Sequence, residues 1–151
     1  MHCCSEPLLR NAATTRRRSW AGVERQIAYS GVDQELFAAF PDFKPDALSD
    51  GLPYVVAGDF TRYLFDAWCI HDRVIYLRGL AFIEDLQTSR NKEVRNLATV
   101  GYLESIQNTW PQKLLKKNIP YADLGPESKK WWGELNLFWD KRIRFLGESF
   151  Q

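Results

Sequence analysis

The sequence predicts an all-α protein, a compact bundle of about five to seven helices. Three observations lead to this prediction. Residues 58–108 form a long stretch that has no proline and is rich in Leu, Ile, Val, Phe and Ala. Residues 126–146 repeat apolar side chains at helical spacing, with charged side chains largely opposite. Only residues 53–57 have the composition of a strand, and a single short strand cannot build a sheet.

The chain has 151 residues, a length that suits one domain with a core of its own. We expect residues 31–151 to form this single helical domain. Residues 1–30 carry five Arg against two Glu and are expected to be a flexible or partly helical basic extension. Within that extension, residues 20–29 have the spacing of a short helix capped by Ser19.

The first helix of the domain is predicted at residues 33–40, and it ends at Pro41 because proline cannot continue the hydrogen-bond ladder. Residues 42–53 are rich in turn-forming residues and predict a surface loop. Asp59 has the character of an N-cap for the next helix. The inward face of that helix is then formed by Phe60, Tyr63, Leu64, Ala67 and Trp68.

Residues 71–88 are apolar on two sides of the predicted helix. The broad arc includes Ile75, Leu80 and Ile83, and a narrower arc contains Val74, Leu77 and Ala81. A helix that is apolar on two sides needs neighbours on both sides. We therefore expect this helix to be central.

The next predicted helix, residues 91–108, has a stripe of small side chains, formed by Val94, Ala98, Gly101 and Ser105. Small residues allow two helix backbones to approach toward the short end of the roughly 8–10 Å range. Asn91 or Ser89 is placed to cap its start. The stripe therefore predicts close packing against another helix.

Two further helices are predicted toward the C-terminus. A short helix begins at Trp110-Pro111 and ends near Asn118. The last helix begins with Pro126 in its first turn and ends before Gly147. Because several Trp side chains fall on one face of this helix, we expect it to close the core.

Charge and cysteine content exclude several classes of protein. The 20 basic residues nearly balance the 19 acidic ones, so nucleic-acid binding is not expected, except through the Arg-rich extension as an accessory module. Cys3, Cys4 and Cys69 form an odd set that does not indicate a disulfide framework. There is no window of about 18 apolar residues, so no membrane-spanning helix is expected.

The sequence contains no recognisable catalytic constellation. Nucleophile-elbow, P-loop and dinucleotide-binding motifs are missing, and His2 and His71 are its only histidines. His71 stands beside Asp72 at a helix start, and its spacing from Cys69 directs the two side chains apart. We therefore expect no catalytic residue, no metal site and no cofactor.

Three carboxylates leave an alternative open. If Glu84, Asp85 and Glu104 surrounded a pocket, the chain could be a small helical enzyme or a ligand-binding domain, through acid–base chemistry or metal binding. The competing interpretation is structural, with Glu84 neutralised by Arg73 and Asp85 by Arg78.

Several short motifs resemble those of an uncharacterised family of small bacterial helical domains of unknown function. They cover roughly residues 50–145 and are Gly58-Asp59-Phe60, Tyr63-Leu64, Val94-Arg95-Asn96-Leu97, Leu103-Glu104 and Leu124-Gly125-Pro126 with Trp132. Such domains are associated with the immunity proteins that accompany secreted toxins. The resemblance implies a cytoplasmic bacterial protein that binds a partner and supplies no catalytic residues.

Residues 92–98 also resemble the inner helix of a HEAT-type repeat pair, although one copy is not a solenoid. Taken together, the sequence favours a protein-binding module that neutralises a toxin by direct binding, without a membrane and in an undetermined oligomeric state. Arg62, Phe65 and Asp66 are the predicted partner-binding residues, with the lysine-rich face of residues 113–117 as another candidate.

Overall fold

The computed structural model describes the backbone of residues 27–46 and 51–149, and the side chains of those residues up to 142. The predicted basic extension, most of the helix expected at 20–29, and Cys3 and Cys4 lie outside the described residues. Among the described residues, no helix is both long enough and apolar enough to cross a membrane.

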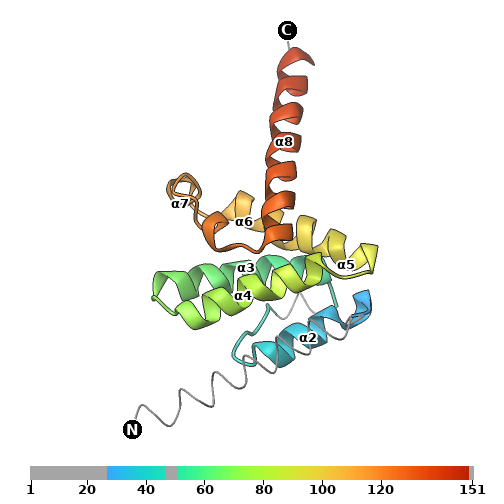
Figure 1. The fold of residues 1–151 in the computed structure, drawn as a ribbon, viewed down its shortest axis with the longest axis vertical. Coiled ribbons are helices and arrows are strands. Elements are labelled where there is room, and N and C mark those ends of the chain that lie inside the picture. Colours follow the sequence, from blue (N-terminus) through green and yellow to red (C-terminus); the bar gives the residue numbers. More distant parts are fainter. Residues whose placement is uncertain (1–26, 47–50, 150–151) are drawn as a thin grey trace.

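The described residues form helices and no strand, so the all-α prediction is confirmed. Figure 1 shows α3 and α4 side by side in the middle, α2 along one side of this pair, and α8 projecting from the other side. The elements are η2 (Tyr29–Gly31), α2 (Val32–Ala39), α3 (Pro53–Cys69), α4 (Arg73–Gln87), α5 (Lys92–Asn96), η4 (Leu97–Leu103), α6 (Glu104–Thr109), α7 (Gln112–Leu115), η5 (Tyr121–Asp123) and α8 (Pro126–Ser149).

Helix α3 begins earlier than its sequence indicates. The N-cap expected at Asp59 is wrong, because the helix starts at Pro53, and residues 53–57 are helical despite their strand-like composition. Proline suits the first turn, where its fixed φ is already helical and its missing N–H has no intrahelical partner. Asp59 lies inside the helix, where its carboxylate accepts a hydrogen bond of 3.2 Å from the backbone amide of Asp46.

Helix α4 packs on the core through its broad apolar arc only. Its start is set by Asp72, whose side chain accepts a hydrogen bond of 3.1 Å from the amide of Ile75. The narrower arc is exposed, with Val74 at 67% and Leu77 at 40% of their full surface. The expectation that neighbours cover both sides of this helix is therefore wrong for the described part of the chain.

The stripe of small residues packs closely against α3, as predicted. A Cβ atom added to Gly101 would lie 3.2 Å from the Cβ of Ala57 in α3, so only glycine permits this separation without a shift of the neighbour. Asn91 caps the start of α5 by accepting a hydrogen bond of 2.9 Å from the amide of Glu93. Between α5 and α6 the chain follows the wider π-helical path of η4.

Helix α8 covers the core with its first half only. Trp132 is 7% exposed and belongs to the core, whereas Phe138 is 53% exposed and Trp131 also reaches the surface. The helix continues past Gly147 to Ser149, so the predicted stop at this glycine is wrong. The expectation that α8 closes the core is thus confirmed for its first half, through Trp132 and Leu135, whereas its second half extends beyond the surface beneath it (Figure 1).

Candidate binding groove

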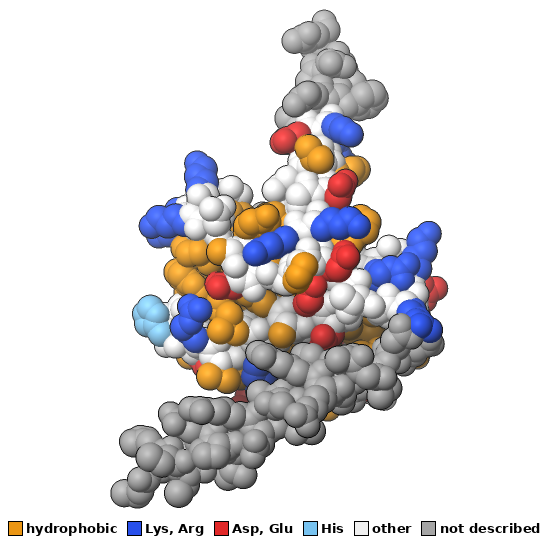
Figure 2. All heavy atoms as spheres, in the orientation of Figure 1, with side chains coloured by type: hydrophobic (Ala, Val, Ile, Leu, Met, Phe, Trp, Pro, Cys, Tyr) orange, Lys and Arg blue, Asp and Glu red, His pale blue; other side chains and the backbone are white. Residues whose placement is uncertain are grey.

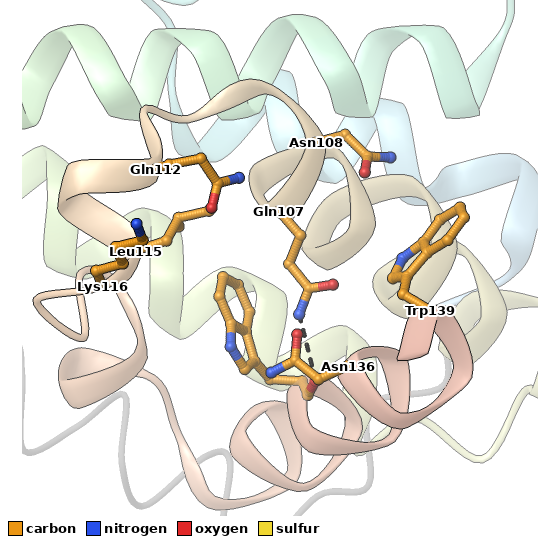
Figure 3. A pocket seen from close by; sticks show the side chains of 8 residues that line it. Gln107, Asn108, Gln112, Leu115, Lys116, Asn136 and Trp139 are labelled. Carbon is orange, nitrogen blue, oxygen red and sulfur yellow. Dashed lines mark hydrogen bonds between the residues drawn. The ribbon is translucent and has the colours of Figure 1, made fainter. Parts of the chain in front are cut away.

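A groove of about 340 Å³ lies between α6, α7 and the middle of α8 (Figure 3). Side-chain carboxamides and indole rings form most of its lining, together with one charged side chain. The lining residues are Gln107, Asn108, Gln112, Leu115, Lys116, Trp132, Asn136 and Trp139.

Trp110 holds the α6–α7 corner of the groove in place. Its buried indole Nε1 donates a hydrogen bond of 3.1 Å to the carbonyl oxygen of Thr61 in α3. Pro111 follows, so α6 ends here and the chain turns into α7. The direction of this turn brings Gln112 and Leu115 to the side of the groove opposite α8.

Gln107 connects α6 to α8 at the floor of the groove. Its Nε2 donates a hydrogen bond of 3.2 Å to the carbonyl oxygen of Trp132, drawn as the dashed line in Figure 3. The indole of Trp132 is itself part of the hydrophobic core. The α8 side of the groove is therefore anchored to α6 by a hydrogen bond and to the hydrophobic core by apolar packing.

An acceptor and a donor at this floor have no hydrogen-bond partner among the described residues. They are the Oε1 atom of Gln107 and the Nε1 atom of Trp139, and both are shielded from solvent. Figure 3 shows the carbonyl oxygen of Gln107 directed toward the indole of Trp139. A buried polar atom without a partner costs about 1–3 kcal/mol. A ligand that carries one donor and one acceptor can satisfy both atoms once the indole of Trp139 moves and exposes them.

The wall formed by α6 and α7 is positively charged. From residue 105 to residue 122 the chain contains Lys113, Lys116 and Lys117 and no Asp or Glu. All three lysines are exposed, and Figure 2 shows lysine side chains gathered over α7. Lys116 also lines the groove directly. This wall therefore attracts negatively charged groups.

The partner-binding residues predicted from the sequence lie on α3, beside the groove rather than in it. Arg62 is 75% exposed and pairs with Asp59 at 4.0 Å, and Asp66 is also exposed. Phe65 packs its ring against Trp110, with the ring centroids 5.5 Å apart. Only Phe65 thus reaches the corner that supports the groove. The role of these residues in binding remains a prediction.

The three carboxylates of the alternative hypothesis do not line the groove. Glu84 accepts hydrogen bonds from the backbone amides of Glu127, at 2.9 Å, and Ser128, at 2.8 Å. It is thus held by the start of α8 rather than by Arg73, which lies eleven residues away and about 16 Å along the same helix. This finding gives Glu84 a structural role.

Arg78, expected beside Asp85, makes contacts with α2. Its guanidinium donates a hydrogen bond of 2.8 Å to the carbonyl oxygen of Ala39 and lies 5.2 Å from the ring centre of Phe40. The polar groups of α4 therefore hold neighbouring helices in position.

Sequence reasoning missed the groove. A usable signal was present, because Trp132, Asn136 and Trp139 recur at helical spacing on α8, and three carboxamides stand at positions 107, 108 and 112. The pattern on α8 is equally typical of core packing. Only the tertiary structure brings these two segments together.

Comparison with known protein families gives one match. Residues 34–140 match the family described as "Domain of unknown function (DUF7674)", and this segment contains every residue that lines the groove. The comparisons with curated proteins and with solved structures found no match. Because the family match spans more than half of the chain, the protein belongs to this family of domains of unknown function.

Proposed function

We propose that this protein is a protein-binding helical module and that the groove between α6, α7 and α8 receives a segment of its partner. The observation that supports this most is the pair of buried, unpartnered atoms at the groove floor, Gln107 Oε1 and Trp139 Nε1. A partner that supplies a donor and an acceptor removes the cost of leaving both atoms without hydrogen bonds.

The groove is small relative to a complete protein interface. Its volume of about 340 Å³ lies near the lower end of the ~300–1,000 Å³ found for ligand sites, whereas stable interfaces bury about 800 Å² on each partner. A partner must therefore cover neighbouring surface as well. The exposed side chains of Arg62 and Asp66 are suited to the rim, because Phe65 between them packs on the Trp110 corner.

We further propose that the partner is a secreted toxin, which this chain neutralises by direct binding in the bacterial cytoplasm. The support is the resemblance of its motifs to the domains associated with immunity proteins. Neutralisation of this kind requires a complementary surface and no catalytic residue of its own.

The experiment that tests this proposal fills the groove with a bulky side chain. Asn136→Trp changes an exposed position of α8 that lines the groove, and Asn96→Trp makes the same change at an exposed position of α5 away from it. Each variant is co-expressed with a toxin encoded beside this gene, and growth and complex formation are measured.

We expect the unmodified chain and Asn96→Trp to bind the toxin and restore growth, and Asn136→Trp to do neither. Equal protection by Asn136→Trp would show that the groove is not the binding surface. No protection by the unmodified chain would refute the toxin-neutralising role.

A further inference from the structure

We infer that the segment bound in the groove is an acidic peptide in extended conformation, recognised mainly through its backbone. This inference rests on the proposed function and specifies the chemistry of the partner. Three properties of the groove lead to it: its carboxamide lining, the arrangement of its unpartnered atoms, and its charge.

The carboxamides match a peptide backbone. Gln107, Asn108, Gln112 and Asn136 line the groove, and each side chain offers both donor and acceptor groups. Each peptide unit of a partner likewise offers one N–H and one C=O. In a helix most of these groups are bonded internally, whereas in an extended segment they are available to another chain. The lining therefore selects an extended segment.

One peptide unit of the partner carries the two groups that these atoms lack, a donor for Gln107 Oε1 and an acceptor for Trp139 Nε1. The N–H and C=O of a trans peptide unit point in opposite directions. The ligand N–H would donate to Gln107 Oε1, and the ligand C=O would accept from Trp139 Nε1. Because both protein atoms are shielded from solvent, the indole of Trp139 has to move when the peptide enters.

Trp139 is well placed for such a movement. It lies on the projecting part of α8, and its ring contacts Phe138, with the ring centroids 5.5 Å apart, and Arg142, whose Cζ lies 5.6 Å from the ring centroid, both in the same helix. Peptide binding should therefore change the fluorescence of Trp139.

The charge of the groove wall specifies the side chains of the ligand. Lys116 lines the groove, Lys113 and Lys117 stand beside it, and residues 105–122 contain no acidic residue. An acidic peptide is attracted to this wall, whereas a basic one is repelled. The same argument disfavours the chain's own N-terminal 30 residues as the occupant, because these carry five Arg against two Glu.

The test uses the full chain and three fluorescein-labelled hexapeptides. The first alternates Asp and Val, the second alternates Lys and Val, and the third is the Asp–Val peptide with N-methylated peptide bonds, which keeps the charge and removes the backbone donors. Binding is followed by fluorescence anisotropy at two ionic strengths and by the tryptophan emission of the chain and of Trp139→Phe.

Two charge reversals provide a matched pair. Lys116→Glu changes the groove, and Lys92→Glu makes the same change at an exposed position of α5. We expect the Asp–Val peptide to bind the unmodified chain. Its affinity should fall about 3- to 10-fold with Lys116→Glu and with added salt, and it should not change with Lys92→Glu. The Lys–Val peptide, which the lysines repel, and the N-methylated peptide, which lacks the backbone donors, should each bind at least about tenfold more weakly.

Four results would overturn the inference. Equal binding of the N-methylated peptide would show attraction by charge alone, and equal binding of the Lys–Val peptide would show that charge has no role. Displacement of the peptide by an oligothymidylate at equal concentration would assign the groove to nucleic acid. If no peptide binds while Asn136→Trp still abolishes toxin binding, this inference fails and the proposed function stands.

Discussion

Glu84 in α4 and Ser128 in α8 are joined by a hydrogen bond of 2.8 Å, in which the amide of Ser128 donates to the carboxylate of Glu84. The second carboxylate oxygen accepts from the amide of Glu127 at 2.9 Å. A carboxylate in this place satisfies amides that lack partners within the helix and interacts favourably with the positive end of the helix dipole. The direction in which α8 leaves the core, and therefore the shape of the groove, depends on this contact.

The first prediction concerns this cap. Glu84→Ala removes the acceptor for two backbone amides at the start of α8, and we expect it to lower the free energy of unfolding by about 1–3 kcal/mol. Urea denaturation followed by circular dichroism measures the change. Glu134→Ala removes an exposed carboxylate from the same helix and should alter stability by less than about 0.5 kcal/mol. Equal effects of the two variants would contradict a capping role for Glu84.

The second prediction compares two glycines near the same contact. A Cβ atom at Gly125 would overlap the carboxylate of Glu84, whereas a Cβ atom at Gly133 in α8 meets nothing within 4 Å. Gly125→Ala should therefore destabilise the protein by about 1–3 kcal/mol through displacement of the cap. Gly133→Ala should stabilise it by up to about 1 kcal/mol through helix propensity. Thermal denaturation should show a lower midpoint for Gly125→Ala and a higher midpoint for Gly133→Ala. A stabilising effect of Gly125→Ala would refute this packing.

The third prediction concerns two tyrosines of the core. The hydroxyl of Tyr102 is buried and has no hydrogen-bond partner among the described residues, whereas the hydroxyl of Tyr76 donates to Asp123 at 2.9 Å. Tyr102→Phe should leave stability unchanged or raise it, because it removes an unsatisfied polar group. Tyr76→Phe should lower stability by about 1 kcal/mol. Urea midpoints compare the two, and a loss of more than about 1 kcal/mol for Tyr102→Phe would contradict the first expectation.

The fourth prediction is an alkaline loss of stability. Burial raises the pKa of Tyr102, with a further contribution from the charge of Asp33, and burial together with the hydrogen bond to Asp123 raises the pKa of Tyr76. Both folded pKa values thus exceed the unfolded value of about 10. The contribution of these raised pKa values to the free energy of unfolding is complete below pH ~10. It falls as pH rises further, by up to ~1.4 kcal/mol per pH unit for each tyrosine.

Urea midpoints measured between pH 9 and about 12 check this dependence. The double variant Tyr76→Phe/Tyr102→Phe should show a shallower decline above pH ~10 than the unmodified chain. Parallel pH profiles for the two proteins would contradict the assignment to these tyrosines.

The sequence alone was sufficient for the features that depend on local periodicity and on caps. Helical spacing and the position of Pro41 located α2 to within one residue at each end. Asn91 marked the start of α5, Pro126 marked the start of α8, and the small side chains of residues 94–105 indicated the close contact with α3. Each of these features is visible within a window of a few residues.

Only the tertiary structure decided which apolar faces are buried and where the groove lies. Val74 and Phe138 have the same helical spacing as core residues, yet they are exposed because the described part of the chain places no helix over them. Likewise, no local pattern joins Glu84 to the amide of Ser128, or Gln107 to the carbonyl of Trp132. These contacts link residues 25 to 44 positions apart, so they depend on how the helices pack and not on the order of side chains within any one of them.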